Sequence, residues 1–401
     1  MADFKKVLLK IKSNKFNLIF ASTIGVIIVV SAVLLCLSYS VYKDEKAKNS
    51  VLSDKLFKTQ NTLTALQNQD QVKINQDLKK EIDNINKTYK KTSSIYEEIT
   101  DIDAQKGKTD DLKKQYAQIL VYLSERNYAS ADASLTVLKT GADKEKDRIA
   151  TLATPGGATL STANLPTSNT PPGAGYSRQV VSALGSTYVV DIVAADMGST
   201  RVIVDTASDG DCHDNCPVLS LGDYVARSGA FAGVNGSYFC PADYPTCAGK
   251  SNSFDTLAMN KNKHYLNSDN NVYSTVPAVI FQPGSMRYVG ASQEWGRDTS
   301  VDGVLANQPL LLSGGEVRFG GGSDPKQGSK GNRSFVGNKG NIAYIGVVHN
   351  VTVAEMAQVL KAMGLDGALN LDSGGSTALW SGGYKAGPGR AIPNAVLFVR
   401  K

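Results

Sequence analysis

The stretch from Ala368 to Leu379 holds residue types suited to binding an anion and acting on it. Its first four residues, Ala368–Leu371, predict a short buried strand, so Asp372 stands at the end of that strand. Ligands of open sheets commonly bind at strand ends. The residues after Asp372 can turn the backbone tightly, point N–H groups at one spot and add hydroxyls: Gly374, Gly375, Ser376 and Thr377. The alternative is a polar turn in which Asp372 only caps a helix.

Five segments, in order along the chain, resemble the phosphodiester glycosidase family. Asn370-Leu-Asp-Ser-Gly-Gly-Ser-Thr377 is similar to the signature of that family. The other four are Gly233-Val-Asn-Gly-Ser-Tyr-Phe239, Asn307-Gln-Pro-Leu-Leu-Leu312 with the following Gly-Gly-Glu-Val, Arg333-Ser-Phe-Val-Gly337 and Arg390-Ala-Ile-Pro-Asn-Ala-Val-Leu397. The resemblance covers roughly the last 225 residues, a length typical of one domain. One departure is Ser373, where the family usually has glycine.

The resemblance implies a hydrolase that breaks the bond between sugar and phosphate in sugar-1-phosphodiesters of surface glycans or polysaccharides. Such a site stabilises positive charge on the sugar and negative charge on the departing phosphate. Asp372 is the expected carboxylate on the sugar side. Arg333 and Arg390 are expected to hold the phosphate, because a guanidinium donates two parallel hydrogen bonds. The complete set of expected substrate-binding residues is Asn235, Ser237, Arg333, Asn370, Gly374, Gly375, Ser376, Thr377 and Arg390.

Glu294 is the second candidate catalytic carboxylate, because the side chain of neighbouring Trp295 can stack on a sugar face. The alternative for Glu294 is an ordinary surface residue. No cofactor is expected. A divalent cation such as calcium at Asp372 stays open, although no set of ligands around it indicates a metal. The second class of function is a non-catalytic module that binds a glycan or a phosphosugar in the same pocket.

The net charge of +6 is distributed unevenly along the chain. Residues 177–401 contain 18 Lys/Arg and 18 Asp/Glu, so 25 basic and 19 acidic residues remain for residues 1–176. A neutral C-terminal part argues against nucleic acid as its partner. The basic excess belongs to the N-terminal part and fits a membrane.

An uncharged run from Phe16 to Tyr42 predicts a transmembrane helix. Within it, Leu18–Leu37 supplies about 20 apolar residues, which is enough to cross a bilayer. Five lysines precede the run: Lys5, Lys6, Lys10, Lys12 and Lys15. Lysines before the span and a large domain after it predict a signal anchor at residues 18–42. Residues 1–17 would then be a cytoplasmic tail, and the C-terminal domain would lie outside the cell. A cleaved signal peptide is the alternative.

Residues 43–150 contain apolar side chains at spacings of three and four, which predicts amphipathic helices. The pattern is interrupted at Lys106-Gly107-Lys108 and at Asn127-Tyr128. We expect a stalk or small bundle of two to four helices, with self-association through it as one interaction. A continuous coiled coil ranks second, because the heptads are irregular. The Asp and Lys side chains of these helices are interpreted as a solvated face and not as a binding patch.

Four of the five cysteines lie in one short region, which favours two disulfides over a zinc site. The pairs that close short local loops are Cys212–Cys216 and Cys240–Cys247. Crossed pairing is the alternative. These disulfides would agree with a location outside the cell.

Residues 151–176 are uncharged and rich in Thr, Ala, Ser, Pro and Gly, which predicts a flexible linker. Residues 177–401 are then the globular domain. Alternation of apolar and polar residues predicts that Thr187–Ala194 and Thr200–Thr206 are paired strands. Thr352-Val-Ala-Glu355 predicts a capping box that opens a helix. The expected fold class is α+β, with a mixed β-sheet and a few helices, preceded by the transmembrane helix and the helical stalk.

Overall fold

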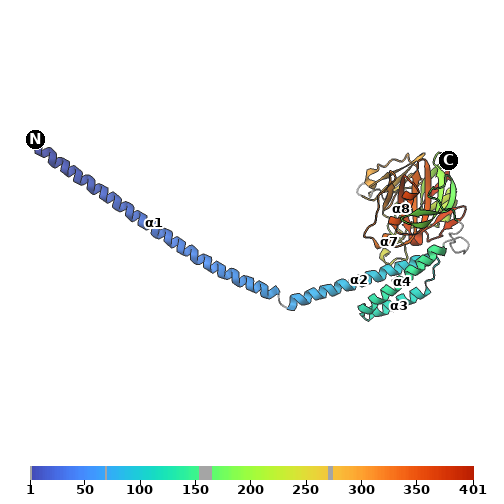
Figure 1. Cartoon of the computed structure of the whole chain (residues 1–401), viewed down its shortest axis with the longest axis horizontal. Coiled ribbons are helices and arrows are strands. Elements are labelled where there is room, and N and C mark those ends of the chain that lie inside the picture. Colours follow the sequence, from blue (N-terminus) through green and yellow to red (C-terminus); the bar gives the residue numbers. More distant parts are fainter. Residues whose placement is uncertain (1, 68–69, 153–164, 270–273) are drawn as a thin grey trace. The chain divides into compact units, whose positions relative to one another are not determined.

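The computed structural model describes residues 2–67, 70–152, 165–269 and 274–401, and the chain divides into two compact units, Met1–Asn84 and Ile85–Lys401. The first unit contains α1 (Ala2–Gln67) and the start of α2 (Asp70–Ala104) (Figure 1). Within Ser22–Leu66, α1 contains an 18-residue stretch with a mean hydropathy of 2.6, so the helix is long and apolar enough to cross a membrane. A helix of this kind near the N-terminus is typical of a membrane span or a signal sequence. The side chains before Ser22 lie outside the described residues.

The second unit begins with a small helical bundle. It consists of the end of α2 with α3 (Asp110–Ser124) and α4 (Tyr128–Leu152). The helices break at the two places that the sequence predicts. Their shared core contains Ile95, Ile99, Ile102, Leu112, Ile119, Leu123, Leu135 and Leu138. These apolar faces are what hold short helices together, since isolated helices are marginal in water.

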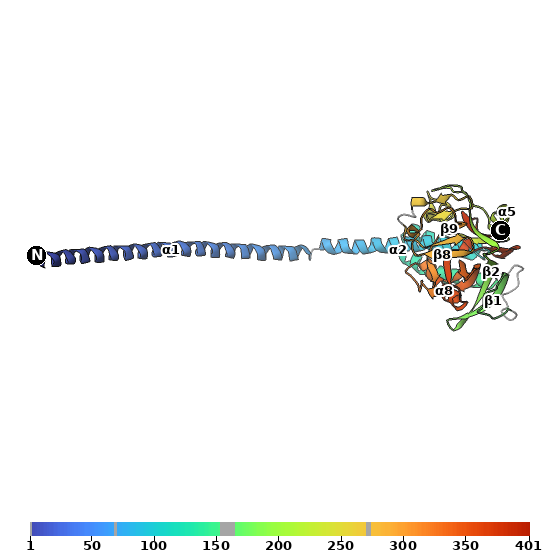
Figure 2. The ribbon, with the colours of Figure 1, turned by 90° about the horizontal axis from the view of Figure 1, so that it is seen from above.

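The C-terminal domain is built from three β-sheets and two longer helices. The seven-stranded sheet has the order β1 (Gly175–Ala183), β2 (Ser186–Asp196), β13 (Ile342–Val351), β12 (Gly331–Lys339), β14 (Gly367–Ser373), β10 (Leu310–Ser313) and β11 (Glu316–Val317). A five-stranded sheet has the order β16 (Tyr384–Ala386), β15 (Leu379–Ser381), β4 (Ala232–Asn235), β17 (Asn394–Arg400) and β3 (Thr200–Thr206). The second five-stranded sheet has the order β6 (Tyr265–Leu266), β5 (Ala258–Met259), β9 (Gly303–Ala306), β7 (Ala278–Gln282) and β8 (Ser285–Val289). The helices are α5 (Leu221–Ser228) and α8 (Val353–Ala362). The α+β class is confirmed, and the β1–β2 hairpin lies at one edge of the domain (Figure 2).

Two apolar cores lie on opposite faces of the seven-stranded sheet. On β12, Val336 joins the core shared with the two five-stranded sheets, while its neighbour Phe335 joins the core under α8. On β14, Leu369 and Ala368 divide in the same way. Because side chains alternate along a strand, the seven-stranded sheet buries one face against the two five-stranded sheets and the other face against α8. This burial makes β14, which ends at Ser373, a rigid support for the turn that follows it.

The capping box of α8 is confirmed. The Thr352 hydroxyl accepts a hydrogen bond from Glu355 N at 3.1 Å, and the Glu355 carboxylate accepts one from Thr352 N at 2.8 Å. The predicted Thr187–Ala194 and Thr200–Thr206 strands exist as β2 and β3, but their pairing with each other is wrong. Both edges of β2 are already hydrogen-bonded, to β1 and to β13, so β3 pairs with β17 in another sheet.

The expected linker is only partly described, because residues 153–164 lie outside the described residues. Its later part has regular contacts. Ser168 N donates to Val180 O at 2.9 Å, and Val180 N donates to Pro166 O at 3.0 Å. Strand β1 begins at Gly175, so this part of the stretch lies against the domain.

Candidate active site

The ends of β14 and β4 are tied together at Asp372. Asp372 N donates to Gly236 O at 2.9 Å, and Asn235 Nδ2 donates to Asp372 O at 2.6 Å. Asn235 Oδ1 accepts from Ser334 Oγ at 2.7 Å. The Asn235 side chain is fully buried and its amide is engaged in these contacts, so it holds the turn in place. Two of the segments that carry the family resemblance therefore meet at one point.

Three further expected substrate-binding residues lie in the walls behind the turn. Asn370 Nδ2 donates to Tyr238 OH at 2.6 Å. Ser237 N donates to Asn394 Oδ1 at 2.8 Å. The Thr377 hydroxyl donates to a main-chain carbonyl of β12 at 3.1 Å. All three side chains are buried. Their contacts shape the site from outside the pocket.

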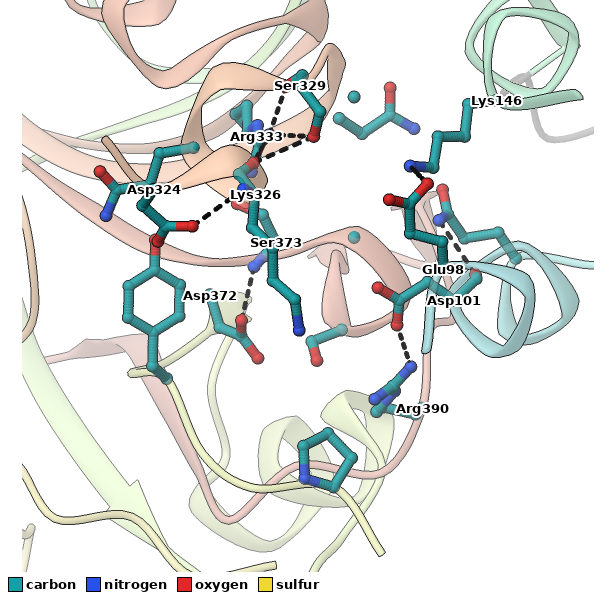
Figure 3. Close-up of a pocket in the computed structure, with 18 of the residues that line it drawn as sticks. Glu98, Asp101, Lys146, Asp324, Lys326, Ser329, Arg333, Asp372, Ser373 and Arg390 are labelled. Carbon is teal, nitrogen blue, oxygen red and sulfur yellow. Dashed lines mark hydrogen bonds and ion pairs between the residues drawn. The ribbon is translucent and has the colours of Figure 1, made fainter. Parts of the chain in front are cut away.

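A pocket of about 280 Å³ opens at this turn (Figure 3). Its wall includes the expected residues Arg333, Asp372, Gly374, Ser376 and Arg390. The other lining residues are Glu98, Asp101, Gln105, Lys146, Tyr238, Phe239, Pro241, Tyr244, Gln308, Asp324, Lys326, Gln327, Ser329, Lys330, Gly331, Asn332 and Ser373. The pocket thus brings one predicted carboxylate and both predicted arginines together.

The turn contains two glycines, and Gly374 is the one that the backbone conformation requires. Gly374 has φ +63°, in the left-handed region that glycine adopts without strain. A Cβ atom on Gly375 would collide with the Arg390 guanidinium and with the Asp101 carboxylate. By contrast Ser373, where the family usually has glycine, has φ −142° and ψ −167°, an extended conformation open to any residue. The departure at Ser373 therefore strains nothing.

Asp372 is half-buried among several charged and polar neighbours. Burial raises the pKa of its carboxyl to about 6, while hydrogen bonds from Ser376 and Ser373 and the charge of Arg390 act to lower it. Ser373 N donates to Asp372 Oδ1 at 2.8 Å. A carboxyl group with a pKa near 6 changes charge close to neutral pH, which is typical of groups that act on protons or on developing charge.

Arg333 is buried, with 7% of its surface exposed, and donates to carbonyl groups. The Nη2 atom of Arg333 donates to Lys326 O at 2.6 Å and to Ser329 O at 2.5 Å, and its Nε atom donates to Val351 O at 3.3 Å. Burial lowers the pKa of Arg333. These bonds fasten the segment around α7 (Pro325–Gly328) to β12, so Arg333 supports one wall as well as lining it.

Arg390 differs from Arg333 in what it contacts. Its Nη2 atom forms an ion pair with Asp101 of α2, and its guanidinium lies 4.9 Å from the centre of the Tyr244 ring. Its Nε atom is buried and has no hydrogen-bond partner among the described residues. The side chain is 9% exposed. Arg390 therefore retains an unused donor at the pocket.

The interpretation of the Asp and Lys side chains of the N-terminal helices as a solvated face is wrong for Asp101 of α2, and Glu97 of the same helix also contacts the C-terminal domain. Glu97 Oε2 accepts from Lys326 Nζ at 2.6 Å, and Asp101 Oδ1 accepts from Tyr244 OH at 2.6 Å. The helix pattern alone shows which residues share a face, but not which surface that face meets.

Glu294 does not lie in the pocket. It is exposed at the end of a short 3-10 helix, Ser292–Glu294, and does not line the pocket walls. The adjacent Trp295 is only 7% exposed and belongs to a separate apolar core, where its Nε1 donates to Tyr265 OH at 3.0 Å. Its indole is therefore not available to stack on a sugar bound beside Asp372.

Both predicted disulfides are confirmed: Cys212–Cys216 and Cys240–Cys247. The second one closes the loop that brings Tyr244 to the pocket. Neither Tyr244 nor Lys326 is among the site residues predicted from the sequence. The loop between two nearby cysteines was the only local signal for Tyr244, and nothing in the sequence marks Lys326.

Comparisons with known proteins give the family. The sequence profile described as phosphodiester glycosidase matches residues 228–399. A comparison with curated protein sequences gives no match.

Three solved structures resemble the chain at low identity. A hypothetical protein from Synechocystis has 13% identity and a TM-score of 0.40, and the match covers 56% of this chain and 62% of that one. The catalytic domain of zebrafish N-acetylglucosamine-1-phosphodiester alpha-N-acetylglucosaminidase has 14% identity and a TM-score of 0.44, with 59% of this chain and 87% of that one covered. A putative exported protein from Burkholderia pseudomallei has 12% identity and a TM-score of 0.34, with 53% of this chain and 74% of that one covered. The chain thus spans less than two thirds of the Synechocystis protein. On the profile match, residues 228–399 are a domain of the phosphodiester glycosidase family.

Proposed function

We propose that this protein hydrolyses sugar-1-phosphodiesters in surface glycans or polysaccharides, releasing the sugar and leaving a phosphomonoester. The observation that carries the proposal is the pocket in which the half-buried Asp372 lies with Arg333 and Arg390. Its carboxylate and guanidinium groups match the two charges that develop when the bond between sugar and phosphate breaks.

In this mechanism the C1–O bond breaks and its electron pair leaves with the phosphate oxygen. The anomeric carbon gains positive charge, which the Asp372 carboxylate stabilises. Water adds its oxygen to that carbon, and its proton passes to Asp372 or to solvent. Phosphate is a good leaving group, so a strong general acid is not needed.

Phosphate binding is assigned to Arg390 and to the N–H groups of the Gly374-Gly375 turn. The Arg390 Nε–H is buried without a partner, and a buried donor is costly unless something accepts its hydrogen bond. A phosphate oxygen would fill that role. Arg333 contributes charge at the same pocket, although its donors already hold carbonyl groups.

The test is the release of free sugar from a panel of sugar-1-phosphate methyl esters by the purified full chain, measured from pH 4 to 9. We expect kcat/KM to rise through about pH 6 and then level off, because the pKa of Asp372 is about 6 and the ionised form is the active one. Below that pKa the rate should fall about tenfold for each pH unit.

Each sugar-1-phosphate methyl ester is a phosphodiester with one negative charge throughout this pH range. The pH profile therefore reports on groups of the protein. A rate that declines as pH rises through 6 would show that Asp372 acts in its protonated form. Tight binding of the esters with no sugar released would instead support the alternative function, a glycan- or phosphosugar-binding module.

We also propose that α1 anchors the protein in the cell membrane with the C-terminal domain outside. The apolar stretch in α1, the lysines before it and the two disulfides support this orientation. Protease added to intact cells is expected to remove the C-terminal domain, as detected by an antibody against it. A cytoplasmic protein serves as the control for cell integrity. Protection of the domain until the cells are lysed would contradict the orientation.

A further inference from the structure

One side of the pocket is closed by α2, a helix outside the matched family domain (Figure 3). Asp101 accepts a hydrogen bond from Tyr244 and pairs with Arg390. One turn earlier, Glu97 accepts hydrogen bonds from Lys326 and from the Thr246 hydroxyl. Residues four apart share a helix face. Two carboxylates of α2 are therefore presented together to one surface of the domain.

The contact between Asp101 and Arg390 is largely shielded from water, whereas the Lys326 side chain that pairs with Glu97 is 53% exposed. The Glu97 side chain is 5% exposed, the Asp101 side chain 20% and the Arg390 side chain 9%. Ion pairs on an open surface contribute little because water and salt screen them. Shielded pairs attract more strongly. The helix is thus held by charge at the place where the pocket opens.

The Asp101 carboxylate lies where an anion is expected. It pairs with one nitrogen of Arg390, and a Cβ atom on Gly375 would meet both groups. The carboxylate therefore lies directly against the glycine turn whose N–H groups suit an anion.

Asp101 nevertheless satisfies Arg390 incompletely. Guanidinium groups commonly bind carboxylate or phosphate through two parallel hydrogen bonds. Here the Nη2 atom is paired, but the buried Nε–H has no partner among the described residues. A phosphate group carries more oxygens than one carboxylate and is not fixed to a helix, so it can reach both donors.

From these contacts we infer that the acidic face of α2 and the phosphate group of a ligand compete for Arg390. The surface made by Tyr244, Thr246, Lys326 and Arg390 binds the Glu97–Asp101 turn of this same chain, and this structure is its closed state. A phosphate-bearing ligand binds when Asp101 leaves. The identity of that ligand as a phosphodiester rests on the proposed function, but the competition itself does not.

The experiment measures the binding of inorganic phosphate to the full chain by calorimetry at constant pH and ionic strength. Asp101→Asn keeps the size of the side chain and removes its charge, so the competitor for Arg390 is weakened. We expect the Kd for phosphate to fall about ten- to hundredfold, the range that a charged hydrogen bond supplies. Asp83→Asn is the matched control, because Asp83 is an exposed residue of the same helix, and its Kd should equal that of the unmodified chain.

Glu97→Gln is a second variant, which weakens the other contact of the same helix face. The Kd for phosphate should fall in this variant too, but by a smaller factor than in Asp101→Asn, since Lys326 and not Arg390 loses its charged partner. Thermal unfolding followed by tryptophan fluorescence shows that each variant is folded.

Three results would overturn the inference: an unchanged Kd in Asp101→Asn, weaker phosphate binding in that variant, or no phosphate binding by any of the proteins. Weaker binding would mean that Asp101 positions Arg390 for the ligand. Because inorganic phosphate carries no sugar, a protein that releases no sugar but binds phosphate more tightly in Asp101→Asn would contradict the proposed hydrolysis and leave the competition standing.

Discussion

Replacing Asp372 by asparagine is expected to lower kcat for sugar release by about 100- to 10,000-fold, the range of a general acid–base contribution. Asparagine keeps the shape of the side chain and its acceptor for Ser373 N, which lies 2.8 Å from Oδ1, but it carries no charge. The carboxylate would contribute most when the sugar carries positive charge, so KM should change much less than kcat. Steady-state kinetics above pH 7, where Asp372 is ionised in the unmodified protein, measure the effect.

The free energy of unfolding of Asp372→Asn distinguishes an effect of the lost charge on catalysis from an effect of unfolding. The pKa of Asp372 is raised from 3.8 to about 6, so the folded protein binds more protons than the unfolded chain between those values. Stability from this group therefore falls as pH rises through the window. Asparagine has no charge to bury, so Asp372→Asn should be at least as stable as the unmodified protein at pH 7. Asp243→Asn, an exposed change beside the pocket-lining Tyr244, is the control for activity. Equal sugar release by Asp372→Asn and the unmodified protein would contradict the catalytic role.

The second large effect concerns Arg333. Replacing it by methionine keeps an unbranched apolar stem but removes the hydrogen bonds of Arg333 to Lys326 O, Ser329 O and Val351 O. Carbonyl groups left without donors are costly, so we expect the free energy of unfolding to fall by about 2–4 kcal/mol. Urea unfolding followed by tryptophan fluorescence is suited to this measurement. The chain has two tryptophans, Trp295 and Trp380, and both lie in the C-terminal domain.

Arg318→Met is the matched control for this prediction. Arg318 is exposed, and its hydrogen bond to Ser313 O is long, at 3.4 Å. Its loss should change the unfolding free energy by less than about 0.5 kcal/mol. If Arg333→Met were as stable as this control while phosphate binding disappeared, Arg333 would be a ligand of the anion and its carbonyl contacts would be incidental.

The local sequence was enough to predict the central strand and turn. Ala368–Leu371 is apolar except for Asn370, and Asp372 follows it directly, so the position of the acid at a strand end depends on neighbours in the chain. The capping box at Thr352 and the short disulfide loops are equally local, and all were confirmed. Such features are determined by residues a few positions apart.

Contacts between distant residues could not be predicted in this way. Arg333 and Arg390 look alike as motif arginines, yet one holds carbonyl groups and the other faces Asp101, 289 residues away. Glu294 stands beside a tryptophan in sequence, but the fold places that indole in a different core. Burial and charge at a site depend on which surfaces meet.

The sequence by itself therefore determined the glycine turn, the acid beside it and the helical character of the N-terminal part. Only the tertiary structure decided that the acidic face of α2 meets the pocket. Helical periodicity shows that Glu97 and Asp101 share a face. Their partners are Lys326 of the short helix α7 and Arg390 of a loop, which only the folded sheets bring together.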